Sequence, residues 1–404
     1  MTQNVMQKVS TPSSIGQLRA MDGYRGVLAL CVAIYHTAWP SYINETAFFE
    51  QGTVLVDLFF VFSGFLMYGI YRDRIQTWDQ GATFMKRRFA RLYPIHLFML
   101  LLMALFAAVR LVAHDYGLAS TQVGEILPFH DGARETWYSF FVNIFMLQAT
   151  GLTDSLTFNY PSWTISGDLF AYSLFAILMV IAPPKKFTSF LPLLIIMTGI
   201  YAFLATQKAN MDITYDYGAI RVIAGFIAGM FGAFIFTKIK SHNGHEKFLN
   251  NRIFINILEV FALMAFILFV IYMPGKLQFF VAPFAFIFVV VFSFNAGLIS
   301  KFMSNKLFAY FAKISYSVYM VHIIVAIVMG MAADIFIVPA LLDSGTMPTL
   351  LGDLYLIPYL LLVIAFSHLT YHLIEVPGGK IMSKIQIRGS IKYLTRKLLP
   401  VLAK

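Results

Sequence analysis

Long apolar runs restrict the fold of this chain more than any other feature. A run of about 17–25 apolar residues is long enough to cross a bilayer as a helix. We predict ten such spans, at residues 24–40, 53–71, 92–113, 166–182, 188–206, 218–237, 253–273, 277–297, 314–334 and 354–374. Of the 404 residues, 59% are hydrophobic and 12% charged, whereas soluble domains carry about 25% charged residues. The sequence therefore predicts an all-α polytopic membrane protein.

The charges between the runs predict the topology. Loops rich in Lys and Arg alternate with neutral or acidic loops, and both ends of the chain are basic as well. The basic loops are 72–91, 183–187, 238–252 and 298–313, and the others are 114–136, 207–217 and 335–353. Because cytoplasmic loops carry the excess of Lys and Arg, both termini are predicted to be cytoplasmic, which requires an even number of crossings. The net charge of +10 thus reflects topology, and no nucleic-acid partner is predicted.

An eleventh apolar stretch, residues 137–150, is short for a crossing. If it crossed, every later basic loop would lie outside the cell, against the positive-inside rule. We therefore interpret 137–165 as a re-entrant or non-crossing segment on the outer side. Such a segment is tolerated at membrane depth only where it is buried in protein or lines a cavity.

The rest of the chain predicts a simple domain organisation. Residues 1–17 form a polar cytoplasmic tail without a cleavable signal, 18–380 form one membrane domain, and 381–404 form a basic tail suited to an anionic inner leaflet. The single cysteine, Cys31, excludes an intramolecular disulfide, and no metal site is predicted.

Two ionisable residues in the first span are functional candidates, because charges inside a bilayer are costly. His36 follows Arg25 by 11 positions, which on a helix places both on one face, about 16 Å apart. The topology puts Arg25 at the cytoplasmic edge and His36 in the outer third. The alternatives are a snorkelling anchor for Arg25 and a hydrogen-bonded packing residue for His36.

Two carboxylates are expected near the depth of His36. Asp57 opens the second span from the outer side, and Asp168 opens the helix after the non-crossing segment. A carboxylate beside a histidine fixes its tautomer and raises its basicity, as general-base catalysis requires. Alternatively, both are charges that the dipole favours at helix N-termini.

Other polar residues allow two interpretations each. Arg88 and Arg91 share a helix face before the third span, either as flanking charge or as a phosphate clamp. Tyr319 and His322 form interhelical hydrogen bonds or belong to a site. For Arg221 and Glu259, near span ends, snorkelling or capping would suffice.

Six sequence elements resemble those of the acyltransferase-3 family of integral-membrane O-acyltransferases, in the family's order. They are R-x-x-D-G-x-R-G…H at 19–36, F-F-x-x-S-G-F at 59–65, RRFARLYP at 87–94, PSWTISGD at 161–168, SYSVYMVH at 315–322 and YHLIEVP at 371–377. The sequence departs from the family in one element, since Asp168 and Thr164 stand where the family usually has Glu and often has Ser.

The resemblance implies transfer of an acyl group, commonly acetyl, from acyl-CoA to a hydroxyl of a surface or exported glycan. Acyl-CoA is then a donor substrate rather than a resident cofactor, and the expected location is the bacterial inner membrane. A transporter with an ionisable pathway and an acyltransferase acting on a lipid or peptide remain alternatives.

The expected roles follow the same resemblance. Arg88, Arg91 and Arg25 bind the coenzyme. His36 acts as general base or covalent acyl relay, oriented by Asp57 or Asp168. The residues expected to contact substrate are Trp163, Ser166, Ser63, Tyr319 and His322.

Overall fold

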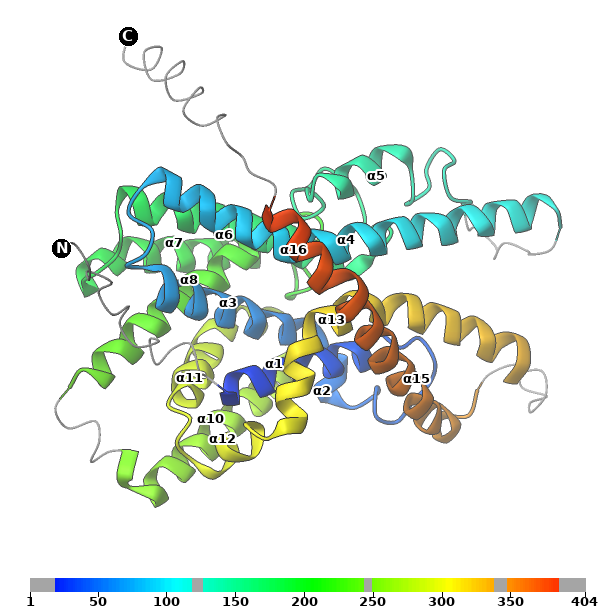
Figure 1. Cartoon of the computed structure of the whole chain (residues 1–404). Helices are drawn as coiled ribbons and strands as arrows, with labels where there is room; N and C mark the ends of the chain where they lie inside the picture. The colour runs from blue at the N-terminus through cyan, green and yellow to red at the C-terminus, as the bar shows by residue number, and fades with distance from the viewer. Residues whose placement is uncertain (1–18, 118–125, 243–248, 338–346, 385–404) are drawn as a thin grey trace, which may run out of the picture.

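The computed structural model describes residues 19–117, 126–242, 249–337 and 347–384 (Figure 1). Within these ranges the chain is helical and has no strand, as predicted. The helices are α1 (Arg19–Tyr35), α2 (Ala47–Glu50), η2 (Gly52–Val54), α3 (Leu55–Tyr71), α4 (Trp78–Asp115), α5 (Trp137–Ile144), η3 (Tyr160–Ser162), α6 (Trp163–Ile181), α7 (Phe187–Gln207), α8 (Gly218–Lys240), α10 (Arg252–Tyr272), η4 (Gly275–Phe280), α11 (Val281–Ser293), α12 (Leu298–Met303), α13 (Lys306–Ala332), the π-helix η5 (Ala333–Ile337), α15 (Thr349–Thr370), the π-helix η6 (Tyr371–Glu375) and α16 (Val376–Lys384).

Nine helices in the described ranges are long and apolar enough to cross a membrane. Each overlaps one of the predicted spans, so the multi-pass all-α class is confirmed. The prediction of 72–91 as a loop is wrong in part, because α4 begins at Trp78 and most of this basic segment is helical. The remaining predicted span, 24–40, corresponds to α1, which has 17 residues and begins at Arg19. It packs between α13 and α3 in the interior, so α1 is the helix on which a count of ten crossings depends.

In the predicted non-crossing segment, the part before Tyr160 contains one short helix, α5, of eight residues. A helix of that length rises about 12 Å, far less than the hydrocarbon thickness of about 30 Å. Thr136 and Ser139 close a capping box at its start, and turns follow as far as Asn159. The next apolar helical segment begins at Tyr160, so the non-crossing part is shorter than the predicted 137–165.

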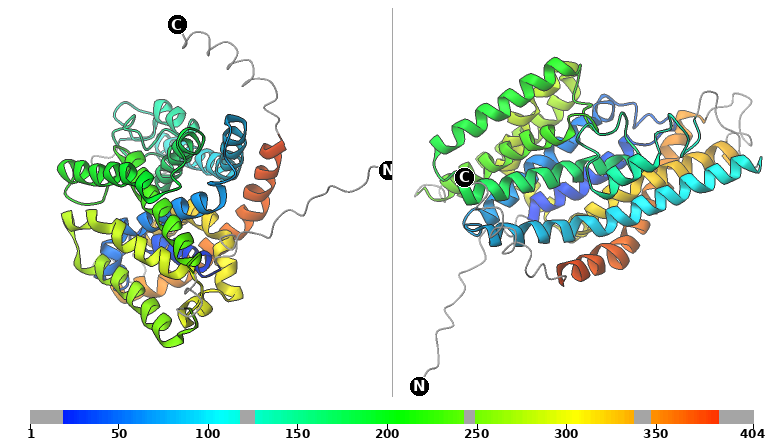
Figure 2. Two further views of the ribbon diagram at one scale, coloured as in Figure 1. Left: turned by 90° about the vertical axis from the view of Figure 1, so that its left-hand side faces the viewer. Right: turned by 90° about the horizontal axis from the view of Figure 1, so that it is seen from above.

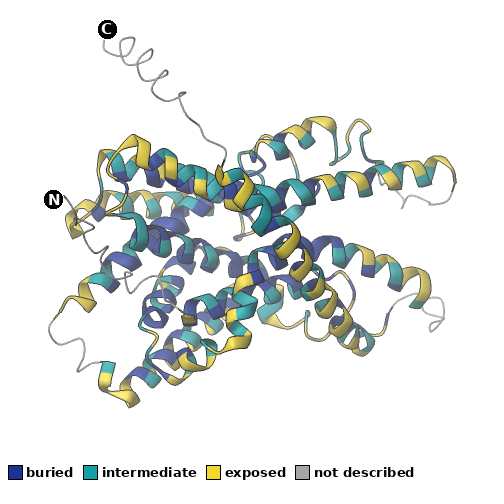
Figure 3. Ribbon diagram, in the orientation of Figure 1, coloured by how far each residue is buried: buried dark blue, intermediate teal, exposed yellow. Residues whose placement is uncertain are grey.

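Close approach of α3 and α8 forms the centre of the bundle. A Cβ atom at Gly229 would lie 2.0 Å from the Val61 carbonyl oxygen, and one at Gly64 would lie 2.0 Å from that of Phe226. Small residues at helix interfaces allow backbones to touch, which strengthens packing where lipid supplies no hydrophobic driving force. Figure 3 shows burial concentrated in these inner helices and exposure on the outer ones.

The long helices lie side by side along one direction (Figure 2, right), and α16 crosses over α4 (Figure 1). At this crossing a Cβ atom on Gly378 would lie 2.5 Å from Cβ of Pro94. Arg19, in the first helix, and Lys380, in the last, line the same cavity. The two ends of the main described region therefore lie on one face, as an even number of crossings requires. The predicted tails, apart from residues 381–384, lie outside the described residues.

Candidate active site

Three cavities follow one another through the helices that carry the predicted site residues. The first, here the basic cavity, has a volume of about 800 Å³ and lies between α1, α4, α13 and α16. Its basic residues are Arg19, Arg25, Arg87, Arg88, Arg91, Lys313 and Lys380, and its acidic ones are Asp22 and Glu375. The excess of cations makes it a site suited to a strongly anionic ligand.

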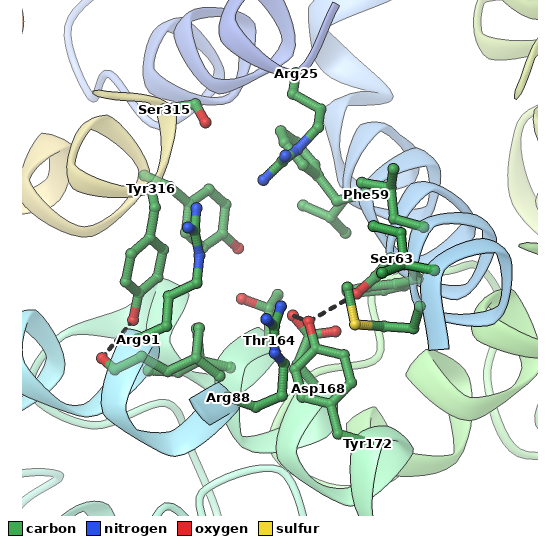
Figure 4. Close-up of a pocket in the computed structure, with 18 residues that line it drawn as sticks. Arg25, Phe59, Ser63, Arg88, Arg91, Thr164, Asp168, Tyr172, Ser315 and Tyr316 are labelled. Atoms are coloured by element: carbon green, nitrogen blue, oxygen red, sulfur yellow. Dashed lines mark hydrogen bonds between the residues drawn. The ribbon is translucent and has the colours of Figure 1, made fainter. Parts of the chain in front are cut away.

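The second, here the central cavity, has a volume of about 260 Å³ and is lined by α1, α3, α4, α6 and α13. Arg25, Arg88 and Arg91 line it together with Asp168, and Figure 4 shows these side chains around one space. Nε of Arg88 and Oδ1 of Asp168 are buried and have no hydrogen-bond partner among the described residues. Buried polar atoms are nearly always satisfied in folded proteins, so these two orphaned atoms indicate a place for a polar ligand.

The third, here the histidine cavity, has a volume of about 230 Å³ and contains His36. Its polar and aromatic lining comes from the end of α1, the segment before α3, η3 and the start of α6, the loop before α8, α8 itself and α13. These residues are Tyr35, His36, Thr53, Tyr160, Trp163, Asp212, Thr214, Arg221 and Tyr319.

The cavities adjoin in the order basic, central, histidine. Arg25, Arg88 and Arg91 line both the basic and the central cavity. Val56 and Tyr319 line both the central and the histidine cavity. The structure therefore brings the predicted arginines and His36 into one series of spaces.

His36 lies directly after the last residue of α1 and contacts His322 of α13. Its Nδ1 atom is 2.9 Å from the Val32 carbonyl oxygen and 3.3 Å from Nε2 of His322. Nδ1 of His322 lies 3.3 Å from the Val318 carbonyl oxygen. Because carbonyl oxygens only accept, both rings carry their proton on Nδ1. This arrangement leaves the Nε2 lone pair of His36 as its basic site.

The expected pairing of His36 with Asp57 is wrong. Both carboxylate oxygens of Asp57 accept from Arg221, at 3.3 Å to Nε and 2.6 Å to Nη2. Asp57 is fully buried and Arg221 is 1% exposed. The expectation that Arg221 snorkels is wrong as well, since its guanidinium is held inside the bundle by the carboxylate.

Asp168 also lies away from the histidine cavity. Its Oδ2 atom accepts from the Tyr172 hydroxyl at 3.4 Å, and that hydroxyl is 2.8 Å from the hydroxyl of Ser63. All three residues line the central cavity with the arginines (Figure 4). Asp168 follows Trp163 by more than one helical turn, which places it toward the arginine end of α6.

Ser166 and Trp163 are placed differently from each other. The Ser166 hydroxyl is fully buried, donates to the Met146 carbonyl at 2.7 Å and accepts from the Ala149 backbone N–H at 3.3 Å. Ser166 therefore fixes the loop after α5, and its predicted role in binding substrate is not supported. Trp163 lines the histidine cavity, with the Arg221 guanidinium 5.3 Å from its ring centroid.

Sequence reasoning missed two contributors to the histidine cavity, Asp212 and Arg221. Arg221 also donates to the carbonyls of Ile213, at 2.9 Å, and Thr53, at 2.6 Å. It thereby joins two segments of the cavity wall to α8. An arginine near the start of an apolar run was visible in the sequence, but no neighbouring residue indicated which groups it would bind.

Residues 18–372 match a family model described as "Acyltransferase domain". The chain belongs to the acyltransferase-3 family. The predicted resemblance is therefore confirmed, and family membership places the chain among enzymes rather than transporters.

Two curated proteins are similar to parts of this family member. Acyltransferase MdmB of Streptomyces mycarofaciens is 33% identical over 93 residues, which are 21% of this chain and 23% of MdmB. "Protein 2 in picA locus" of Rhizobium radiobacter is 30% identical over 161 residues, which are 39% of this chain and 79% of that protein. The chain thus spans about a quarter of the length of MdmB and most of the second protein. No solved structure matches the chain.

Proposed function

We propose that this membrane protein transfers an acyl group, acetyl in its simplest form, from cytoplasmic acyl-CoA to a hydroxyl of a surface or exported glycan. The observation that carries the proposal is the series of adjoining cavities between the arginines and His36. The positive-inside pattern and the bacterial sources of both relatives support a bacterial cytoplasmic membrane.

The donor end of the proposal depends on charge. Coenzyme A carries three phosphate groups, and guanidinium groups bind phosphate oxygens through paired hydrogen bonds. Arg87, Arg88 and Arg91 of α4 line the basic cavity opposite Lys313 and Lys380. Arg25, at the boundary with the central cavity, then lies beside the path of the pantetheine arm.

The reacting end depends on His36. Nε2 takes the proton of the acceptor hydroxyl while the hydroxyl oxygen attacks the thioester carbonyl, and the carbon–sulfur bond then breaks. The protonated imidazole returns a proton to the departing thiolate, so that the ester and free coenzyme A form. In the covalent relay, Nε2 attacks the thioester carbonyl first, the carbon–sulfur bond breaks and coenzyme A leaves as the thiolate. The acceptor oxygen then attacks the acyl group on Nε2, the carbon–nitrogen bond breaks, and the hydroxyl proton passes to the thiolate.

The size of the histidine cavity supports a short acyl group. It holds about 230 Å³, below the range of about 300–1,000 Å³ of pockets for drug-sized ligands. Acyl carbonyl and acceptor hydroxyl must meet there, which leaves little room for a long chain.

The deciding experiment compares His36→Ala with His130→Ala in purified full-length protein. His130 lies in an outer loop, where its Nδ1 atom contacts the Pro128 carbonyl at 3.1 Å. We expect His36→Ala to bind acetyl-CoA normally and to lose acyl transfer, while His130→Ala behaves like the unmodified protein. Acyl transfer retained in His36→Ala would refute the proposed chemistry. Incubation with acetyl-CoA alone, followed by mass analysis of the peptide containing His36, separates the covalent relay from the direct route.

The donor site is tested by Arg88→Ala and Arg91→Ala, with Arg74→Ala as the matched control. Arg74 is exposed at the end of the same basic loop and lines none of the three cavities. Weaker binding of acetyl-CoA to the first two variants alone supports the proposal. Equal affinity for acetyl-CoA in all three variants would contradict the donor site and leave Arg88 and Arg91 as charges that flank a membrane span.

A further inference from the structure

The loop between α7 and α8, residues 208–217, is fixed on both sides of Asp212. The Met211 backbone N–H donates to the Gln278 side chain at 2.9 Å, and the Ile213 carbonyl accepts from Arg221. Met211 and Ile213 are both fully buried. The Ile213 backbone N–H donates to the Met211 carbonyl at 2.8 Å, which closes a three-residue turn with Asp212 at its centre. Both neighbours are buried and Asp212 is exposed, so its side chain lies outside the packed interior, where it lines the histidine cavity.

Asp212 alone sets the formal charge of this cavity at neutral pH. Among the described residues, the only other one in its lining with a permanent charge is Arg221. That charge is compensated by Asp57, and the guanidinium also donates to two backbone carbonyls. Among the described residues no cation forms an ion pair with Asp212: Lys208, on the same loop, is close enough to interact with it, but makes its direct ion pair with Asp216.

We infer that Asp212 determines acceptor specificity by charge: the histidine cavity admits neutral or cationic acceptors and rejects anionic ones such as uronates or phosphorylated sugars. The statement about acceptors rests on the proposed function, whereas the charge of the cavity does not. A like charge at close range lowers affinity, and this is how charged side chains exclude wrong partners.

The experiment measures the cavity charge with small thiol reagents of opposite sign. Cys31 is the only cysteine, so Cys31→Ala combined with Thr214→Cys places a single thiol in the cavity lining. Its rate of modification by the trimethylammonium-ethyl and sulfonato-ethyl methanethiosulfonates is measured in full-length protein. The same pair of rates is measured after Asp212→Asn and, as a matched control, after Asp154→Asn. Asp154 is an exposed outer carboxylate that does not line the cavity.

We expect the cationic reagent to react faster than the anionic one. Asp212→Asn should lower the ratio of the two rates about tenfold, because one nearby negative charge attracts one reagent and repels the other. Asp154→Asn leaves the ratio unchanged. A ratio that is the same with and without the Asp212 charge overturns the inference. The reagents require neither acyl-CoA nor acceptor, so this failure is distinct from the loss of acyl transfer that would refute the proposed function.

Discussion

Removal of the Asp57 carboxylate tests how the interior of this protein tolerates charge. Asp57 and Arg221 are both essentially inaccessible, and their closest atoms are 2.6 Å apart. In Asp57→Ala the guanidinium stays buried without its counterion. Leaving one partner of a buried pair alone costs about 3–5 kcal/mol, whereas replacing both by apolar residues of similar size is often neutral.

The double variant Asp57→Leu with Arg221→Met therefore recovers most of the loss, but not all of it. Arg221 also donates to the carbonyls of Thr53 and Ile213, and these oxygens lose their donor. A buried acceptor left without a partner costs about 1–3 kcal/mol. We expect the double variant to be more stable than Asp57→Ala and less stable than the unmodified protein.

The assay is equilibrium unfolding in mixed detergent micelles titrated with sodium dodecyl sulfate and followed by tryptophan fluorescence. Lys208→Ala is the control, because its ion pair with Asp216 is partly exposed and exposed pairs contribute about 0–1 kcal/mol. The hydrogen bond to Asp216 raises the pKa of Lys208, so the lysine is charged at neutral pH and its contribution is lost as the pH rises through the lysine pKa. If the double variant loses as much free energy of unfolding as Asp57→Ala, or more, the reasoning is refuted.

Three further predictions follow from individual contacts. Gly64→Ala places a Cβ atom against the backbone of α8 and should destabilise the protein by about 1–3 kcal/mol or more in the same titration, whereas Gly199→Ala, which meets nothing within 4 Å, should be neutral or stabilising. Glu259→Ala removes the carboxylate that accepts from backbone N–H groups at the start of α12. The free energy of unfolding should fall by about 1–2 kcal/mol, as for other helix caps. An unchanged free energy of unfolding would contradict a capping role. His322→Phe removes the partner of His36 and should slow acyl transfer about fivefold, equivalent to one hydrogen bond of about 1 kcal/mol, without changing the affinity for acetyl-CoA; an unchanged rate would leave His322 as a packing residue.

The sequence by itself determined the fold class and the position of nearly every crossing helix. This was possible because a run of about 20 apolar residues can be read directly from the sequence. Inside lipid, where no water is available, such a run satisfies its backbone hydrogen bonds by forming a helix. The short segment 137–150 was likewise assigned correctly as non-crossing, from the charges of loops far along the chain. The family, too, was recognisable from six short elements.

Only the tertiary structure decided which polar groups meet. Asp57 pairs with Arg221, 164 positions away, and His36 meets His322, 286 positions away. A depth estimate from topology placed Asp57, Asp168 and His36 at similar heights, but height does not fix position around a helix axis or which neighbour a face contacts. Long-range pairing depends on helix packing, here set by close contact between α3 and α8 at Gly64 and Gly229. For the same reason Asp212 could be identified as part of the histidine cavity only once the burial of its two neighbours had fixed its direction.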